Sequence, residues 1–400
     1  MKKNAPKRRG SKQGQQSLTA LLLLWLSGNA LRLTILAVPP VLALIQHDLR
    51  LSGTEIGVLT GLPVILFALA AVPGSLLIAR VGAVPALVIG LLLAAAGSAL
   101  RGVAPGVAAL YAATILMGAG IAVMQPSLPP IVRGWLPGRI GFGTAVYTNG
   151  LLVGEALPVG LTIPFVLPLM AGSWRGSLVF WSLPLVVIAL LVFVLQPRSA
   201  VAAAPARRWW PDWRDPLLWK LSFVMGAANT MYFCSNGFLP GYLASVGRSD
   251  LIGPALSGLN IGQLPASFLL LAMASRWERR AWPFLAAGVI ALTGIAGIVT
   301  TANFWTVVSA GFIGFACAGV LALALALPAL LVPHEDVPRL AAGMFTVGYG
   351  VAMLVSVIAG ACWDATGIAA FAFLPIAIAG LPLILIAPAI DLSRRPGMVG

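Results

Sequence analysis

Apolar runs of about membrane-spanning length dominate this chain of 400 residues, and short breaks rich in glycine, proline or charge separate them. A helix needs about 20 mostly apolar residues to cross a bilayer. Only 9% of the residues are charged, whereas a soluble domain carries about 25%, so most of the chain is expected to lie in lipid. We predict an all-α integral membrane protein with twelve transmembrane helices. These helices are expected at residues 17–45, 54–79, 84–101, 107–133, 141–168, 174–196, 216–244, 251–275, 281–300, 304–332, 339–364 and 369–390.

The basic residues gather at alternate ends of the predicted spans. An even number of spans places both termini on one side of the membrane, and if that side is cytoplasmic, most of the 25 Lys and Arg residues lie there. This positive-inside bias predicts a multi-pass protein of a bacterial inner (plasma) membrane with both termini cytoplasmic. The first apolar run is too long for a signal peptide, so we expect an uncleaved first span. Because the net charge of +14 is dispersed over loops, no nucleic-acid partner is expected.

The two halves of the chain resemble each other. MGAGIAVMQPSLPPIVRGWLP (117–137) aligns with IGFACAGVLALALALPALLVP (313–333) at an offset of 196, and Asn29 pairs with Asn229 at an offset of 200. Two parallel repeats of six spans are typical of the major facilitator superfamily. The predicted parts are a basic cytoplasmic tail (1–16), an N-terminal six-helix half (17–196), a cytoplasmic linker (197–215), a C-terminal six-helix half (216–390) and a cytoplasmic tail (391–400).

Within that superfamily, one stretch is the most specific. NALRLTILAVPPVLALIQHDLRLSGTEIGVLTGLPVILFALAA (29–71) resembles the opening of the cyanate/2-nitroimidazole transporter family (CynX/NimT-like). Asn29 and Arg32 match the family's Asn-Leu-Arg motif, although one extra residue separates them here, and Pro63 matches its Leu-Pro. The stretch 117–137 resembles the family's fourth helix, with Gln125 where an asparagine is usual. The resemblance implies a twelve-helix transporter of small anions or nitroimidazole-like heteroaromatic solutes.

Arg32 is the residue that most needs an explanation, because it lies inside the first apolar run. A mid-membrane arginine costs about 2.5–3.5 kcal/mol on insertion scales, so it is expected to face a cavity or a partner. At 1.5 Å per residue it lies roughly 20 Å into the helix, and helical spacing places Trp25 and Asn29 on the same face. A guanidinium suits small planar anions, so we predict that Arg32 binds substrate. The alternative is that Arg32 ties helices together through backbone carbonyl groups.

Glu155, in LLVGEALPVG, is the only carboxylate well inside a predicted span, at a depth close to that of Arg32. The family usually has a small residue at this position. Two functional interpretations stay open: Glu155 neutralises Arg32, or it takes up a proton and couples transport to a proton gradient. The alternatives are a carboxylic acid kept neutral and one hydrogen-bonded within the bundle.

Uncharged polar residues mark further candidate sites in the second half. Asn229, Tyr232 and Asn236 share one face of the span 216–244, and Asn260 with Gln263 begins a similar stripe on the next span. Polar side chains also join membrane helices, so packing is an equal alternative for each. The predicted substrate contacts are Arg32, Asn29, Gln125, Asn229, Tyr232, Asn236 and Tyr349. Arg80 and Arg276, in corresponding loops of the two halves, are predicted gate residues.

The favoured interpretation is a secondary transporter that moves a small anionic or anion-like solute by alternating access. The rivals are a broad-specificity drug or metabolite exporter of the same fold and, from another class, a membrane sensor or integral enzyme. No nucleophile–base constellation, metal-ligand spacing or Walker motif occurs in the sequence, so no catalytic residue, metal or cofactor is expected. The expected partners are a small-molecule substrate, membrane lipid and, where Glu155 couples transport, protons; the chain is expected to be a monomer.

Overall fold

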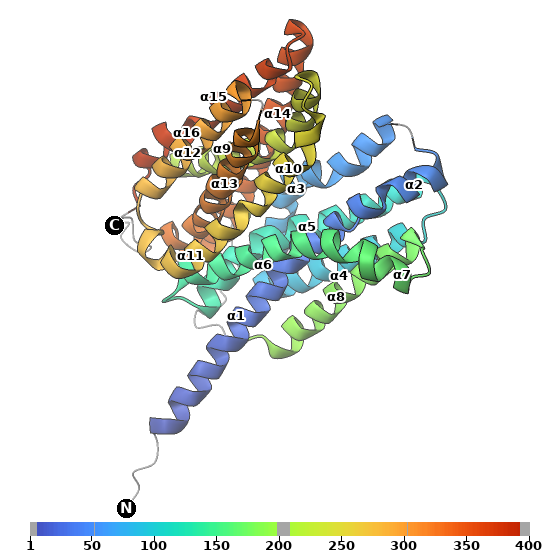
Figure 1. The fold of residues 1–400 in the computed structure, drawn as a ribbon. Coiled ribbons are helices and arrows are strands. Elements are labelled where there is room, and N and C mark those ends of the chain that lie inside the picture. Colours follow the sequence, from blue (N-terminus) through green and yellow to red (C-terminus); the bar gives the residue numbers. More distant parts are fainter. Residues whose placement is uncertain (1–5, 52, 198–208, 302, 393–400) are drawn as a thin grey trace, which may run out of the picture. The chain divides into compact units, whose positions relative to one another are not determined.

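The computed structural model describes residues 6–51, 53–197, 209–301 and 303–392, and the described chain is helical without strands (Figure 1). Within these described ranges, ten helical stretches are long and apolar enough to cross a membrane, and a shorter apolar stretch, Ile65–Val81, lies in a further helix. Each of the predicted spans contains helix in the structure. The all-α membrane prediction is therefore confirmed, and the helices are consistent with the predicted count of twelve.

The chain forms two compact units. The first comprises Met1–Leu66, Pro73–Trp209 and His334–Pro338, and the second comprises Phe67–Val72, Trp210–Pro333 and Arg339–Gly400. Residues 198–208 of the predicted linker, residues 393–400 of the predicted C-terminal tail and residues 1–5 of the basic tail lie outside the described residues.

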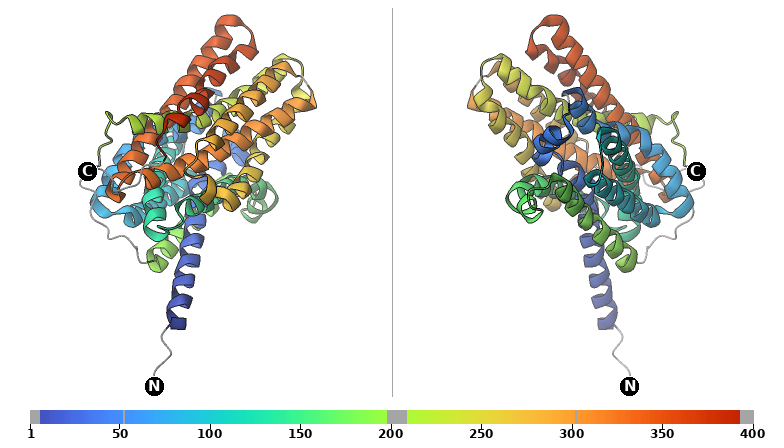
Figure 2. Two further views of the ribbon diagram at one scale, coloured as in Figure 1. Left: turned by 90° about the vertical axis from the view of Figure 1, so that its left-hand side faces the viewer. Right: turned by 90° about the vertical axis from the view of Figure 1, so that its right-hand side faces the viewer.

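The first unit contains the helices of the N-terminal half, except that residues 67–72 within α3 belong to the second unit. Its helix α1 begins within the predicted basic tail, and Figure 2 shows that the first turns of α1 extend away from the other helices of the unit. Helix α1 packs against α6 and α8, and α4 packs against both α5 and α8. The bounds are α1 (Pro6–Leu36), η1 (Pro39–Val41), α2 (Leu42–Leu49), α3 (Gly53–Val81), α4 (Ala83–Gly102), α5 (Val107–Trp135), α6 (Ile140–Leu161), η2 (Thr162–Val166), α7 (Leu167–Leu169) and α8 (Trp174–Leu195).

The second unit contains the helices of the C-terminal half, except that residues 334–338, which form η4 and the first residues of α14, belong to the first unit. Helix α13 is its central helix, because α9, α10, α11 and α12 all pack against it. The bounds are α9 (Pro216–Ser245), η3 (Ser249–Leu251), α10 (Ile252–Ile261), α11 (Gln263–Trp277), α12 (Trp282–Thr300), α13 (Phe304–Leu331), η4 (His334–Asp336), α14 (Val337–Thr366), η5 (Ala369–Ala372), α15 (Phe373–Gly380), α16 (Pro382–Leu385) and η6 (Ala387–Ala389).

Several predicted spans are interrupted. The first breaks at Pro39 and Pro40, because proline has no amide hydrogen to continue the α-helical hydrogen bonds. The fifth changes from α6 into the π-helical stretch η2 before α7. In the second unit, Gly262 separates α10 from α11 at a point where a side chain would overlap the carbonyl oxygen of Gly311. Close helix approach therefore explains the glycine at this last break.

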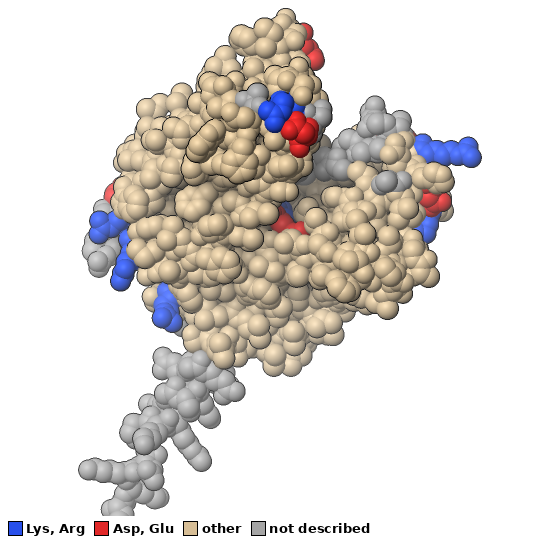
Figure 3. All heavy atoms as spheres, in the orientation of Figure 1, with Lys and Arg blue, Asp and Glu red and all other residues tan. Residues whose placement is uncertain are grey.

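The outer surface is apolar, as a bilayer requires. Leu190, Phe193 and Val194 on α8 are exposed although they are large hydrophobic residues. In the view of Figure 3, Lys, Arg, Asp and Glu of the described residues are few and most of the surface belongs to other residue types. Such surfaces are stable in lipid rather than in water.

Candidate functional site

The crossing of α1 and α6 in the first unit sets up the candidate site. Gly150 and Gly154 face α1 so closely that an added Cβ would overlap the carbonyl oxygen of Trp25 at the first position and of Asn29 at the second. Gly28 on α1 lies in the same way against the backbone of Tyr147. Small residues allow such close approach of membrane helices. The crossing brings the polar face of α1 directly onto α6.

Arg32 and Glu155 meet at this crossing. The Nε atom of Arg32 donates to Oε1 of Glu155 over 3.0 Å, and the two side chains are 6% and 19% exposed. Both residues lie within membrane-spanning stretches. A charge buried alone is very costly, and a partner at hydrogen-bond distance offsets much of this cost. The structure thus brings together the two charged residues that the sequence placed at similar depth.

Asn29 and Trp25 join the same face of α1 to α6. The Nδ2 atom of Asn29 donates to the carbonyl of Trp25 over 3.0 Å, and the indole Nε1 of Trp25 donates to Oδ1 of Asn149 over 2.9 Å. Among the described residues, the buried Oδ1 atom of Asn29 has no hydrogen-bond donor. Asn149 was missed by the sequence analysis, although an asparagine beside a glycine inside an apolar run is an available signal.

Gln125 lies on α5 of the same unit. Its side chain is buried in the middle of this helix, and α5 packs against α1 and α6. Gln125 thus lies inside the first unit, and its role as a substrate contact stays a prediction.

In the second unit, the polar stripes of two predicted spans form one network. The hydroxyl of Tyr232 donates to Oδ1 of Asn260 over 2.7 Å and accepts from Nε2 of Gln263 over 3.1 Å. The amide of Asn260 donates to Oδ1 of Asn236 over 3.3 Å. This network is neutral, and it lies at the break between α10 and α11. It adds Asn260 and Gln263 to the predicted pair Tyr232 and Asn236.

The two other candidates in the second unit lie in different surroundings. Asn229 is buried on α9, and its Nδ2 atom has no acceptor among the described residues. The ring of Tyr349 is buried and stacks on Phe345, with centroids 6.2 Å apart and an interplanar angle of 17°, and it also contacts Phe233. An aromatic cluster of this kind is a packing arrangement as well as a candidate substrate surface.

The predicted gate residues lie at helix ends. Arg80 is exposed in the last turn of α3, and Arg276 is exposed in the last turn of α11. Nη1 of Arg276 lies 3.9 Å from the sulfur of Met273. Within the described residues, no group of three or more His, Cys, Asp and Glu side chains lies together as metal ligands would.

Apolar helices that bury a charged pair in one unit and hold a partly exposed, neutral polar network in the other are typical of membrane transport proteins for small molecules. A family model described as Major Facilitator Superfamily matches residues 21–259. The chain belongs to the Major Facilitator Superfamily and is a transporter rather than an enzyme.

Individual curated relatives make the similarity more specific than the superfamily. The chain is 27% identical over 345 residues to the uncharacterized transporter YycB of Bacillus subtilis (strain 168), covering 84% of each chain. It is 28% identical over 339 residues to the cyanate transport protein CynX of Escherichia coli (strain K12), covering 84% of this chain and 86% of the relative. It is 29% identical over 254 residues to the 2-nitroimidazole transporter of the same strain, covering 62% and 63%. The resemblance to the CynX/NimT-like family is confirmed.

Solved structures confirm the fold. The transporter FucP in the outward conformation matches with a TM-score of 0.71 at 14% identity, over 94% of this chain and 99% of that one. The proton:xylose symporter XylE matches with a TM-score of 0.74 at 12% identity, over 95% and 96%. The major facilitator fold predicted from the internal repeat is therefore present.

Proposed function

We propose that this protein is a secondary transporter that moves a small anionic or anion-like solute across the bacterial inner membrane by alternating access. The observation that carries the proposal is the buried pair of Arg32 and Glu155 at 3.0 Å. A guanidinium presents five donors in a planar fork, and one of them, Nε, is directed to Glu155. A planar anion can take the place of the carboxylate as the partner of Arg32.

Coupling follows from charge balance at this pair. When a substrate anion binds Arg32, the carboxylate of Glu155 loses its counter-charge within a membrane span, where an unpaired charge is costly. Uptake of a proton by Glu155 removes that cost. One proton therefore moves with one anionic charge, and solute accumulates on the alkaline side of the membrane. The names of the relatives that carry cyanate and 2-nitroimidazole support a small planar substrate, and the proton:xylose symporter XylE is a precedent for proton coupling on this fold.

The remaining site residues are proposed in supporting roles. Asn29 and Gln125 contribute hydrogen-bonding groups in the first unit, and Asn229, Tyr232, Asn236 and Tyr349 do so in the second. Arg80 and Arg276 act in the cytoplasmic loops as gate residues. We further propose a monomer with both termini cytoplasmic, built from the halves 17–196 and 216–390 with the linker 197–215 between them.

Uptake into proteoliposomes tests the proposal. The purified protein is assayed with labelled cyanate, a series of small carboxylates and 2-nitroimidazole, with and without a pH gradient. The variant Arg32→Ala is expected to abolish uptake of the transported anion, and Arg32→Lys is expected to reduce it about tenfold or more, because the lysine keeps the charge but loses the planar fork.

Arg248→Ala is the matched control, because Arg248 lies outside the spans and pairs with the exposed Asp250. This variant is expected to transport as the unmodified protein does. Normal uptake by both Arg32 variants would make Arg32 a structural residue and would favour a broad-specificity exporter.

A further inference from the structure

The break between α1 and α2 lies close to Arg32. The amide of Val38 donates to the carbonyl of Ile35, one residue nearer than α-helical geometry requires, and the prolines 39 and 40 offer no amide hydrogens. The carbonyl of Thr34, two residues after Arg32, instead accepts from a side chain. That side chain belongs to Arg101.

Arg101 lies in the last turn of α4 and is only 1% exposed. Its Nη2 atom donates to the carbonyl of Thr34 over 2.6 Å and to Oγ of Ser98 over 3.2 Å. Ser98 in turn donates to the carbonyl of Leu178 on α8 over 3.1 Å. No carboxylate pairs with Arg101 among the described residues. The cation therefore meets the carbonyl end of α1, where the helix dipole favours positive charge.

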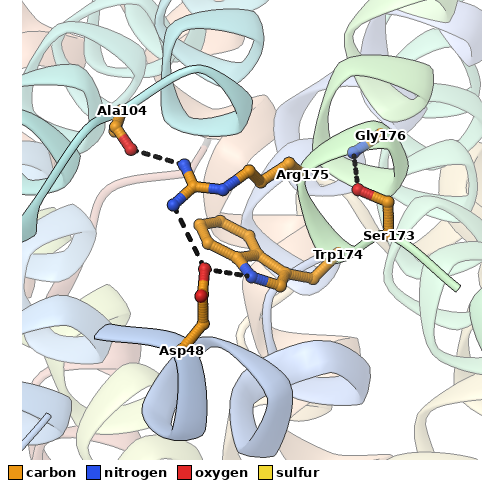
Figure 4. A network of polar contacts seen from close by, with 6 residues as sticks. All are labelled: Asp48, Ala104, Ser173, Trp174, Arg175 and Gly176. Carbon is orange, nitrogen blue, oxygen red and sulfur yellow. Dashed lines mark hydrogen bonds and ion pairs between the residues drawn. The ribbon is translucent and has the colours of Figure 1, made fainter. Parts of the chain in front are cut away.

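The other side of the break is held by a second arginine, and Figure 4 shows this network from close by. Asp48 on α2 accepts from the indole Nε1 of Trp174 and from Nη2 of Arg175, each over 3.1 Å. Arg175 also donates through Nη1 to the carbonyl of Ala104, and its guanidinium lies 4.4 Å from the centroid of the Trp174 ring. Unlike Arg101, the Arg175–Asp48 pair is partly exposed, at 33% and 49%.

Both arginines come from one tightly packed pair of helices. Arg101 lies in the last turn of α4 and Arg175 in the first turn of α8, and a Cβ on Gly102 of α4 would overlap the backbone oxygen of Arg175. Helices α4 and α8 together thus hold α1 through the buried contact of Arg101 and α2 through the partly exposed contact of Arg175. The buried contact is the stronger, because water does not compete for its hydrogen bonds.

We propose that Arg101 is a positioning residue for Arg32: by binding the free carbonyl of Thr34 it fixes the end of α1, and with it the depth and direction of Arg32. The contacts of Asp48 fix only α2 on the far side of the break. The link to transport rests on the proposed function, since it requires Arg32 to bind substrate. The grip on α1 does not depend on that function.

Hydrogen–deuterium exchange of the full chain in lipid nanodiscs, without substrate, tests whether Arg101 holds the end of α1. Arg101→Met is expected to raise amide exchange in peptides that cover residues 30–41 about tenfold or more, because a charge-assisted hydrogen bond is lost. Arg101→Lys keeps a charged donor and is expected to restore part of the protection. Asp48→Asn is expected to raise exchange in residues 42–51 and to leave residues 30–36 protected.

Arg279→Met is the matched control, because Arg279 also donates to two backbone carbonyls, those of Leu330 and Leu392, but lies in the second unit. It is expected to leave exchange at residues 30–41 unchanged. Where Arg101→Met yields no folded protein, Ser98→Ala serves instead: it removes the hydroxyl that joins Arg101 to α8 and is expected to give the same pattern at lower amplitude. Unchanged exchange at residues 30–41 in Arg101→Met, or in Ser98→Ala where Arg101→Met does not fold, would overturn the proposal.

Uptake measurements on the same variants test the link to Arg32. Arg101→Met is expected to raise the KM of the transported solute about tenfold, with rescue by Arg101→Lys, whereas Asp48→Asn keeps a KM within about twofold of the unmodified protein. Raised exchange together with an unchanged KM would overturn the positioning role. Failure of the proposed function is recognised separately, because the Arg32 variants themselves would then transport normally while the exchange result stands.

Discussion

Arg32 and Glu155 carry their charges inside membrane spans, where lipid tails do not stabilise a charge and contact with water is small. Both side chains lie within spans and are mostly buried, so each depends on the other. Removing one partner of a buried pair typically costs about 3–5 kcal/mol, because the other charge is left uncompensated, whereas removing both costs much less. We therefore expect Arg32→Met and Glu155→Gln each to lower the unfolding temperature clearly, and the double variant to recover most of the loss. Thermal unfolding in detergent measures this, and additive effects of the two changes would contradict the pairing.

A second prediction concerns the response of transport to pH. Because Glu155 is the proposed proton acceptor, Glu155→Gln is expected to carry solute without a response to an imposed pH gradient, while the unmodified protein accumulates solute on the alkaline side. The measurement is uptake into proteoliposomes with the gradient in either direction. A gradient response in Glu155→Gln equal to that of the unmodified protein would remove Glu155 from coupling.

Asp250→Asn is the matched control, since it makes the same change of carboxylate to amide at an exposed pair. The hydrogen bonds from Arg248 hold the pKa of the Asp250 carboxyl below its ordinary value, so this carboxyl stays ionised at neutral pH. A depressed pKa contributes stability above the pKa of the unfolded chain, and this contribution is lost only as the pH falls through the lower folded value. Asp250→Asn is therefore expected to leave the response of uptake to the pH gradient unchanged between about pH 6 and 8, the range in which an unperturbed histidine, but not this carboxyl, would titrate.

At the scale of single residues, the sequence of one helix predicts how deep a residue lies in the membrane and which face of the helix carries it. It does not predict which residue of another helix it contacts. Counting residues placed Arg32 and Glu155 at similar depths, and helical phase placed Asn29 and Trp25 beside Arg32. Whether Glu155 meets Arg32 depends on how two helices cross, which one sequence does not state. Asp48 and Arg175 were missed for a related reason: charges at span ends indicate orientation, and their mutual contacts depend on the break after α1.

At the scale of the elements, the α1–α6 crossing determines whether the pair can form. Gly154 has no room for a side chain, because a Cβ there would overlap the backbone of Asn29, whereas Gly160 on the same helix has open space around it. Gly154→Ala is therefore expected to destabilise the protein by about 1–3 kcal/mol through overpacking and to reduce uptake. Gly160→Ala is expected to be neutral or stabilising by up to about 1 kcal/mol, since alanine is the better helix former.

Thermal unfolding and uptake of these two variants provide the measurement. Equal effects of the two changes would show that the crossing of α1 and α6 is not close at Gly154. The comparison is internal to one helix, so differences in expression or in lipid contact are largely shared.

Most helix bounds were predictable to within a few residues, because apolar length and the breaks between runs are local properties of the sequence. The exception is the start of α1, which lies at Pro6 and not at residue 17, because a helix can continue into a polar segment that hydropathy does not mark. The first and fifth predicted spans are longer than the bilayer is thick, which favours a tilt or a bend, and Pro39 with Pro40 locates the bend of the first. The break at Gly262 was not expected. A glycine inside an apolar run is common in membrane helices, and only its contact with Gly311 on α13 identifies this one as a break.

At the scale of the whole molecule, the two units carry the same sequence repeat but different polar contents. The first unit buries an arginine and a carboxylate, whereas the second holds a partly exposed network of Tyr232, Asn236, Asn260 and Gln263 without a formal charge. Repeats that started alike can diverge in this way because the fold requires only that each polar group in a span finds a partner. In the proposed transporter, Arg32 in the first half recognises the charge of the solute, and the second half supplies neutral hydrogen-bonding groups.

Orientation is also a property of the whole chain, since it follows from the distribution of charge over all loops. Three arginines lie close together at 276, 279 and 280, on the side predicted to be cytoplasmic, whereas Asp250 lies at the opposite end of the α10–α11 span. Positive charge is retained on the cytoplasmic side during insertion. We expect a membrane-impermeant maleimide to label Asp250→Cys in intact cells and to label Arg280→Cys only after the membranes are broken.

The unmodified chain measures the background labelling by its own cysteines. This background is expected to be low, because Cys234 and Cys317 are buried and Cys362 is half-buried. Labelling of Arg280→Cys, but not of Asp250→Cys, in intact cells would reverse the orientation. It would also place the break between α1 and α2, with Arg101 and the Asp48 network, on the cytoplasmic side. The predicted orientation therefore decides from which compartment substrate meets the end of α1 that Arg101 holds.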